Sequence, residues 1–259
     1  MCFDHNARPP IPAIAGGATD ARDLTLTSAD GTRFMAYAAR AVNPTGAGMI
    51  VLPDVRGLHQ YYKDLVLRFA EHGVDAIAFD YFGRTAPDND RGESFDWMPH
   101  VGQTKADTMQ ADVAAAAAFL RSAEGGNVKA LFSVGFCFGG ALSSVQSASG
   151  LGYAGVVSFY GWPVGLPIPG VDRPHPIDFV SQFKAPVLAL YGGADQGIPP
   201  EAIQQFDAAL DGAGVSHETH IYEGAPHSFF DRQQEQFAEA SADAWERVKA
   251  FVERNTRAA

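Results

Sequence analysis

Residues 135–140 have the sequence Gly-Phe-Cys-Phe-Gly-Gly and stand between an apolar run, Val128 to Val134, and a segment of small residues, Ala141 to Ala148. This order predicts a strand, a sharp turn and a helix. It is a G-x-C-x-G form of the G-x-S-x-G nucleophile elbow, in which the nucleophile sits in a strained turn. Side chains at Gly135 and Gly139 would collide with the neighbouring strand and helix. The stretch therefore makes Cys137 a candidate nucleophile on an α/β fold.

Cys137 would stand at the N-terminus of the following helix. The helix dipole at that end favours thiolate over thiol, which suits a nucleophilic role. The alternative is a buried structural cysteine after a glycine-rich turn. The strand-turn-helix context favours the nucleophile.

Two further residues complete a possible triad in the chain order nucleophile, acid, histidine. Asp195 follows a predicted strand in Gly192-Gly193-Ala194-Asp195-Gln196-Gly197, and His227 follows the last predicted strand. Asp195 could instead be a turn residue or helix cap, and His227 a structural histidine in a turn. The order nevertheless predicts that Asp195 orients His227 and that His227 activates Cys137.

Strand-like and helix-like segments alternate along the chain, which predicts one α/β domain over residues 1–259 with a mostly parallel sheet covered by helices on both faces. Residues 1–20 are expected to be an irregular extension. An antiparallel hairpin is expected around Asp23 to Leu26 and Arg33 to Ala39. The later predicted strands are Gly48 to Leu52, Val74 to Phe79, Val128 to Val134, Ala154 to Tyr160, Pro186 to Tyr191 and His217 to Tyr222. The predicted helices are Tyr61 to His72, Lys105 to Ala123, Ala141 to Ala148, Pro200 to Leu210 and Glu235 to Val252.

Two long segments lack a clear period, Thr85 to Gln103 and Val164 to Asp178, and both are rich in Pro and Gly. Loops of this length are often lids or site walls. We expect them to border the site.

Composition excludes several classes of protein. The chain has 259 residues, of which 46% are hydrophobic and 19% charged, so it can bury a core and is not disordered or fibrous. A net charge of -11 disfavours nucleic acid and anionic membranes as partners. No apolar run approaches the roughly 18 residues needed to span a bilayer. The start of the chain has no signal-peptide pattern, which predicts a cytoplasmic protein.

Cysteine and histidine spacing predicts no metal and no disulfide framework. Cys2 and Cys137 are the two cysteines, and no H-x-x-x-H or H-E-x-x-H spacing occurs. Both are thiols, or a redox pair joins the start of the chain to its middle. No dinucleotide fingerprint or Walker A lysine is present, so we expect no cofactor.

The combined pattern resembles the dienelactone hydrolase (carboxymethylenebutenolidase) family of the α/β-hydrolase superfamily, which uses a Cys-Asp-His triad. G-F-C-F-G-G carries the resemblance most specifically, with support from G-G-A-D-Q-G-I-P and P-H-S-F, and it extends from about Gly48 to Val252. It implies a carboxylic ester hydrolase with Cys137 as nucleophile, His227 as base and later acid, and Asp195 as the group that orients the imidazole.

The resemblance also implies further site residues. The family's E-x-x-G stretch, whose acid contacts the thiol, matches Asp54-Val55-Arg56-Gly57, and the N–H groups of Val55 and Phe138 should form the oxyanion hole. A family arginine that holds a substrate carboxylate matches Arg84. At a second family arginine this chain has Asp231, and Arg56 or Arg232 could compensate. Each arginine could also be an ordinary surface charge.

The expected substrate is a small activated ester or lactone, which can carry a negative charge, and the protein is expected to be a monomer or small homo-oligomer. Several side chains are candidates to line the substrate pocket, although each aromatic one could equally be core: Trp97, Phe136, Tyr160, Trp162, Ser228 and Phe229. Two other functions stay open. One is a redox-active thiol protein using Cys137 and Cys2. The other is a non-catalytic binding version of the same fold.

Overall fold

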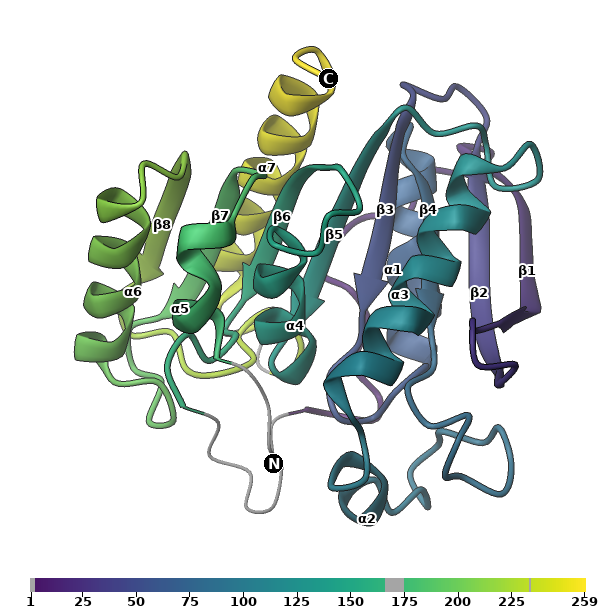
Figure 1. Ribbon diagram of the computed structural model, residues 1–259, viewed down its shortest axis with the longest axis horizontal. Coiled ribbons are helices and arrows are strands. Elements are labelled where there is room, and N and C mark those ends of the chain that lie inside the picture. The colour runs from purple at the N-terminus through teal and green to yellow at the C-terminus, as the bar shows by residue number, and fades with distance from the viewer. Residues whose placement is uncertain (1–2, 166–174, 233) are drawn as a thin grey trace.

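The computed structural model describes residues 3–165, 175–232 and 234–259 and contains an eight-stranded sheet. The order of the strands across the sheet is β1-β2-β4-β3-β5-β6-β7-β8 (Figure 1). Their bounds are β1 Ala18–Thr27, β2 Arg33–Ala41, β3 Ala47–Leu52, β4 Asp75–Phe79, β5 Ala130–Phe136, β6 Tyr153–Phe159, β7 Val187–Gly192 and β8 His217–Tyr222.

The sheet is parallel except at one edge. β3 pairs in parallel with β4 and β5, and parallel pairing continues through β6, β7 and β8. β1 and β2 form the antiparallel hairpin, and β2 joins β4 antiparallel. The mostly parallel sheet and the N-terminal hairpin predicted from the sequence are both confirmed.

Helices cover both faces of the sheet. Figure 1 shows α1 and α7 behind the sheet and α3, α4 and α6 in front of it. The helices are α1 Gln60–Glu71, α2 Met98–Val101, α3 Ala106–Arg121, α4 Phe138–Gln146, α5 Pro176–Phe179, the 3-10 turn η1 Val180–Gln182, α6 Pro200–Gly212 and α7 Ala238–Thr256. Every residue of β3, β4, β5 and β7 is buried, as expected of parallel strands that are covered on both sides.

Several boundaries differ from the sequence prediction. The segment expected to be irregular up to residue 20 ends earlier, because β1 begins at Ala18, and α7 begins at Ala238 rather than Glu235. The 85–103 segment contains the short helix α2. Most of the 164–178 segment lies outside the described residues. Over the described ranges, no helix combines the length and apolarity needed to cross a membrane.

The N-terminal segment packs against the body of the protein before the sheet begins. Phe3, Ala7 and Ile11 are each less than 10% exposed and belong to the hydrophobic core. A segment without helix or strand therefore contributes to the interior. Its first described residues lie beside the loop that follows β3, where Arg56 binds Asp4.

Candidate active site

Cys137 occupies the turn between β5 and α4. Its backbone has φ 55° and ψ −114°, a region in which side-chain-bearing residues are strained. The backbone N–H of Cys137 donates to the carbonyl of Phe159 on β6 at 3.0 Å, and its carbonyl accepts from Gly140 at 2.9 Å. The side chain is buried, with Cys137 only 2% exposed. The turn is therefore fixed by the backbone on both sides of the cysteine.

The glycines of the elbow are required by close backbone contacts. A Cβ at Gly135 would lie 1.8 Å from the carbonyl oxygen of Gly139, and a Cβ at Gly139 would lie 2.1 Å from that of Leu52. Real Cβ atoms do not approach backbone oxygens this closely. The collisions expected from the sequence, with the helix for Gly135 and with a strand for Gly139, are confirmed.

Asp195 and His227 lie in the loops that follow the last two strands and bind each other. The Nδ1 of His227 lies 2.6 Å from Oδ2 of Asp195, at a geometry in which the imidazole N–H donates to the carboxylate. The other oxygen of Asp195 accepts the N–H groups of Gly197 at 2.8 Å and Ile198 at 3.3 Å. Asp195 is thus both a turn residue and the partner of the histidine. These bonds fix the orientation of the imidazole.

Aromatic side chains surround the histidine. The ring centroids of Tyr160 and Trp162 lie 4.9 Å and 4.8 Å from that of His227. Trp162 is held in turn by its Nε1, which donates to the carbonyl of Gly197 at 3.0 Å. Tyr160 has a left-handed backbone with φ 40°, and burial raises the pKa of its hydroxyl well above the usual value. Its hydroxyl therefore stays neutral at ordinary pH.

The remaining predicted lining residues differ in burial. Phe136 stacks on Phe159 at 4.8 Å, and Phe229 is fully buried, so both are core residues beside the elbow and the histidine loop. Ser228 is 1% exposed with a left-handed φ of 62°. Trp97 is half-buried and packs edge-on against Phe3 at 6.5 Å. Their contact with substrate stays a prediction.

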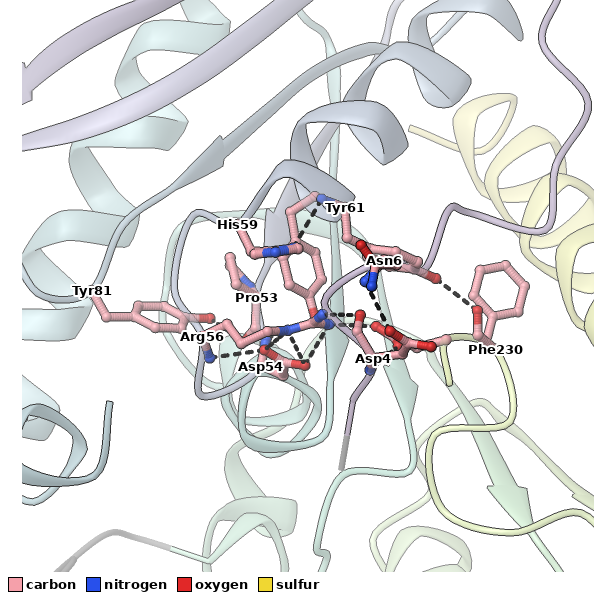
Figure 2. Close-up of polar contacts among 11 residues, drawn as sticks. Asp4, Asn6, Pro53, Asp54, Arg56, His59, Tyr61, Tyr81 and Phe230 are labelled. Atoms are coloured by element: carbon pink, nitrogen blue, oxygen red, sulfur yellow. Dashed lines mark hydrogen bonds and ion pairs between the residues drawn. The ribbon is translucent and has the colours of Figure 1, made fainter. Parts of the chain in front are cut away.

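The predicted thiol-contacting acid has another partner. Asp54 follows β3 and is 3% exposed, and its two carboxylate oxygens accept four hydrogen bonds from Arg56. Arg56 also binds Asp231, the residue that stands where the resembled family has an arginine. Figure 2 shows Asp54, Arg56 and Asp4 gathered in this cluster. A contact of Asp54 with the thiol of Cys137 stays a prediction.

Arg84, which is predicted to bind a substrate carboxylate, forms ion pairs with two aspartates. Its guanidinium lies 3.0 Å from Asp30 and 2.9 Å from Asp112, which is buried. Arg232 is exposed and lines a surface cavity of about 370 Å³ together with Asp4 and Asp231. A role of either arginine in binding substrate stays a prediction.

Electrostatics at the Arg56 cluster depend on burial and charge together. Burial opposes the positive charge of Arg56, but Asp54 and Asp231 outweigh it and raise its pKa above the ordinary value. Burial raises the pKa of Asp231 to about 6, although Arg56 partly offsets the effect. Burial, reinforced by Arg56, lowers the pKa of His59 to about 4. One cation and two carboxylates thus share a space closed to water.

Sequence reasoning did not find this cluster as a unit. Its members come from four separate segments, 3–4, 54–56, 61–62 and 230–231, and include Tyr61, whose hydroxyl donates to the carbonyl of Phe230 at 2.7 Å. No local motif signals such a set. The only available signal was that Asp54 and Asp231 both depart from the resembled pattern, in which a glutamate and an arginine stand.

One further group of side chains has the composition of a metal site. Ligand atoms of Asp207, Asp211 and His217 lie within 4.8 Å of one another, between α6 and the start of β8. The Nε2 of His217 lies 3.1 Å from Asp207. The group is partly exposed and stands at the opposite end of β8 from His227. Exposed acidic groups often gather in this way without an ion.

Comparison with known proteins supports a single family. The model of the dienelactone hydrolase family matches residues 34–256. A Salmonella typhimurium protein named "Putative carboxymethylenebutenolidase" is 31% identical over 244 residues, which cover 92% of this chain and 87% of that protein. A Synechocystis protein of the same name is 31% identical, over 79% of this chain and 85% of its own length.

Solved structures agree with the sequence relatives. The crystal structure named "Putative Dienelactone Hydrolase" from Klebsiella pneumoniae superposes with a TM-score of 0.76 at 28% identity, covering 89% of this chain and 98% of that one. A dienelactone hydrolase-like promiscuous phosphotriesterase from metagenomic libraries has a TM-score of 0.73 at 21% identity, covering 92% and 99%. The latter likeness concerns the fold alone.

Proposed function

The chain belongs to the dienelactone hydrolase family and is a hydrolase acting on esters, and we propose that it cleaves small activated esters or lactones through an acyl-enzyme formed on Cys137. The observation that carries the proposal is the 2.6 Å bond between His227 and Asp195, in a chain whose strained elbow holds Cys137. A nucleophile, a base and a group that orients the base are the three parts such a reaction needs.

The proposed reaction has two halves. His227 takes the proton of the Cys137 thiol, and the resulting thiolate attacks the substrate carbonyl carbon. An S–C bond forms, and the carbonyl electron pair moves onto oxygen, where the N–H groups of Val55 and Phe138 stabilise it. The tetrahedral intermediate collapses, the C–O bond of the leaving group breaks, and the imidazolium of His227 protonates the departing oxygen. Water then gives its proton to His227 and attacks the thioester, which releases the acid and restores the thiolate. Asp195 stabilises the imidazolium in both halves.

The nucleophile limits the substrate. A thiolate leaves from the tetrahedral intermediate more readily than an ordinary alkoxide, so unactivated esters tend to return to starting material. Enol lactones and aryl esters supply a better leaving group. The pocket proposed for them is lined by Trp97, Phe136, Tyr160, Trp162, Ser228 and Phe229, with Tyr160 and Trp162 in contact with the base.

Whether the substrate carries a carboxylate depends on the arginines. Arg84 is paired with Asp30 and Asp112, and Arg56 with Asp54 and Asp231. Each guanidinium is therefore already neutralised by protein carboxylates. These contacts favour an uncharged substrate, and an anionic dienelactone is the alternative that the kinetics below distinguish.

The test compares hydrolysis of a dienelactone and of p-nitrophenyl acetate by wild type and by Cys137→Ala. We expect turnover of at least one substrate by wild type and its loss, by roughly 10³-fold or more, in the variant. Lactone turnover would place the protein in the degradation of aromatic compounds. Full activity in Cys137→Ala contradicts the mechanism.

A second pair of variants tests the base with a matched control. His227→Gln removes the histidine bound to Asp195, whereas His217→Gln removes a histidine bound to Asp207 far from the elbow. We expect the first to abolish turnover and the second to preserve it. Equal losses would mean that the effect is structural.

The same preparations distinguish the other functions. A redox-active thiol protein would show a reversible Cys2 to Cys137 disulfide on a non-reducing gel, and a binding protein would turn over none of the activated esters. We also propose a single cytoplasmic domain that acts without cofactor as a monomer or small homo-oligomer. Size-exclusion chromatography with light scattering measures the oligomeric state directly.

A further inference from the structure

Arg56 binds three separate parts of the chain. Figure 2 shows its guanidinium beside Asp54 and Asp4. Its Nε lies 3.1 Å from both carboxylate oxygens of Asp54, and Nη2 lies 2.9 Å from Oδ2. Nη2 also donates to the carboxylate of Asp231, and Nη1 donates to the backbone carbonyl of Asp4 at 2.9 Å. Arg56 thus binds a residue that lies 175 positions further along the chain.

The ion pairs of Arg56 with Asp54 and Asp231 are closed to water, whereas the bond to Asp4 is partly buried. Arg56 is 1% exposed, and both aspartates are 3% exposed. The guanidinium carbon stands 4.5 Å from the ring centroid of Phe3 and 5.6 Å from those of Tyr61 and Tyr62. A buried guanidinium holds its partners in a fixed plane because its donors are rigidly arranged. The cluster is therefore a rigid link between the segments it joins.

The link joins two loops of the proposed site. We call residues 53–59, which follow β3, the oxyanion loop, and residues 223–231, which follow β8, the histidine loop. A second contact holds the histidine loop to α1, the helix that directly follows the oxyanion loop, because the hydroxyl of Tyr61 donates to the carbonyl of Phe230 at 2.7 Å. In the oxyanion loop, the N–H of Asp54 donates to the hydroxyl of Tyr62 at 3.0 Å.

Both loops carry groups that act on one substrate carbonyl in the proposed mechanism. The N–H of Val55 lies between the two residues whose side chains form the Arg56 to Asp54 pair, and His227 lies four residues before Asp231. We propose that Arg56 is a positioning residue, which sets the oxyanion loop relative to the histidine loop. The inference rests on the proposed function and assigns Asp54 the role of anchor for this arginine.

The test uses Arg56→Met, which removes the charge and the hydrogen bonds but keeps most of the side-chain volume. Misplacement of a reacting group by about 1 Å can cost on the order of 100-fold in rate. We therefore expect kcat for p-nitrophenyl acetate to fall by about 100-fold, with KM changed by less than about threefold, because oxyanion stabilisation acts in the transition state. Arg56→Lys, which keeps the charge without the planar fork, should not restore kcat.

A matched control separates positioning from stability. Arg68 pairs with Glu71 on α1, and Glu71 accepts the N–H of Ile14, just as Asp231 accepts the N–H of Asp4. Arg68→Met thus breaks a similar pair away from both loops. We expect its kcat to match wild type at a temperature where it and Arg56→Met are fully folded.

If Arg56→Met does not fold, Asp231→Asn tests the positioning role of Arg56 in its place. Asp231 uses one oxygen for the N–H of Asp4 and the other for Arg56, and asparagine has a single acceptor oxygen, so one of the two bonds is lost. We expect kcat to fall about 10-fold with little change in KM. The proposal is overturned if Arg56→Met, or Asp231→Asn in its place, keeps kcat within twofold of wild type. It is also overturned if kcat falls as far in the control Arg68→Met as in Arg56→Met.

The outcome for Arg56 is distinct from the outcome for the mechanism. Cys137→Ala is measured in the same series. Full turnover in that variant contradicts the proposed function itself. Loss of turnover there, with unchanged kcat in folded Arg56→Met, defeats only the positioning role.

Discussion

The elbow around Cys137 and the cluster around Arg56 serve the same edge of the sheet but are built in different ways. The elbow is six consecutive residues whose backbone approaches its neighbours so closely that glycine is required at Gly135 and Gly139. The Arg56 cluster draws on four segments, which are joined by two buried ion pairs and by hydrogen bonds to the backbone carbonyls of Asp4 and Phe230. The first depends on steric exclusion and the second on charge, so they should respond to different perturbations.

The elbow should tolerate substitution less well than the Arg56 cluster. In Gly139→Ala the new Cβ would meet backbone oxygens of Leu52 and Pro53 at 2.1 and 2.3 Å. Neither oxygen can move without disturbing β3, so we expect a loss of roughly 4 kcal/mol or more of the free energy of unfolding, together with loss of activity. Urea unfolding followed by circular dichroism measures the change.

Gly212→Ala is the control for this substitution. Gly212 ends α6, and no atom lies within 4 Å of a Cβ built there. We expect unchanged or slightly higher stability, since alanine favours helix over glycine by up to about 1 kcal/mol. A Gly139→Ala protein as stable as Gly212→Ala would show that the elbow is not sterically closed.

The Arg56 cluster should make the free energy of unfolding depend on pH. Burial raises the pKa of Asp231 to about 6, so the folded state binds a proton more tightly than the unfolded state, whose aspartate titrates near 3.8. This group therefore favours folding below about pH 4 and loses that contribution as the pH rises to about 6. The difference corresponds to roughly 3 kcal/mol.

Asp231→Asn removes this titration. We measure the unfolding free energy of the variant minus that of wild type at each pH. We expect this difference to rise by a few kcal/mol from pH 4 to pH 7, whether the variant is more or less stable at pH 4. Asp54, Arg56 and Tyr61 interact electrostatically with Asp231 and remain in both proteins. Parallel pH profiles of unfolding free energy would show that folding does not raise the pKa of Asp231.

A partly exposed pair should give a smaller effect than the buried cluster. Arg84 binds Asp112 and Asp30, and its side chain is 19% exposed. We expect Arg84→Ala to cost about 1 to 2 kcal/mol of stability, since Asp112 loses its partner while removal of the partly exposed Arg84 side chain opens a path for water to the carboxylate.

The same variant tests the carboxylate site. Because Arg84 is already neutralised, we expect KM to change equally for anionic and neutral esters. A KM increase confined to anionic esters would instead establish Arg84 as a substrate-binding residue.

The smallest expected effect concerns the start of α1 beside the cluster. His59 caps this helix, with its Nδ1 accepting the N–H of Tyr61 at 3.2 Å. Removal of a cap costs about 1 kcal/mol, which is the loss expected of His59→Ala in thermal unfolding at pH 8.

Acid should narrow and then reverse this difference in unfolding free energy between wild type and His59→Ala. Burial and the nearby Arg56 lower the pKa of His59 to about 4, so the wild type loses stability as the pH falls from about 6.5 to about 4, and the variant does not. If the difference in unfolding free energy between wild type and His59→Ala is constant over this pH range, His59 is not held neutral in the folded protein.

Much of the fold could be predicted from the sequence because its signals are local. The short apolar runs at β3, β4 and β5 mark strands covered on both faces, and the structure confirms them with shifts of one or two residues. The short helix α2 was not predicted, because four residues containing a proline carry no helical period.

The same distinction applies to the site. Cys137, Asp195 and His227 could be proposed from the sequence because each follows a strand, and the carboxyl ends of parallel strands meet at one edge of the sheet. Backbone geometry then requires particular residues in a short stretch, as the glycines at the elbow illustrate. The sequence alone therefore determined the fold class, the family and the candidate triad.

Only the tertiary structure decided the partners of the charged residues. Arg56, Arg84 and Asp54 were equally compatible with surface, substrate or thiol contacts in the sequence, since a charge does not encode its partner. In the folded protein Arg56 meets Asp54 and Asp231 away from water. The physical reason is that ion pairing depends on distance in space and on burial, and neither quantity is a property of a local stretch of chain.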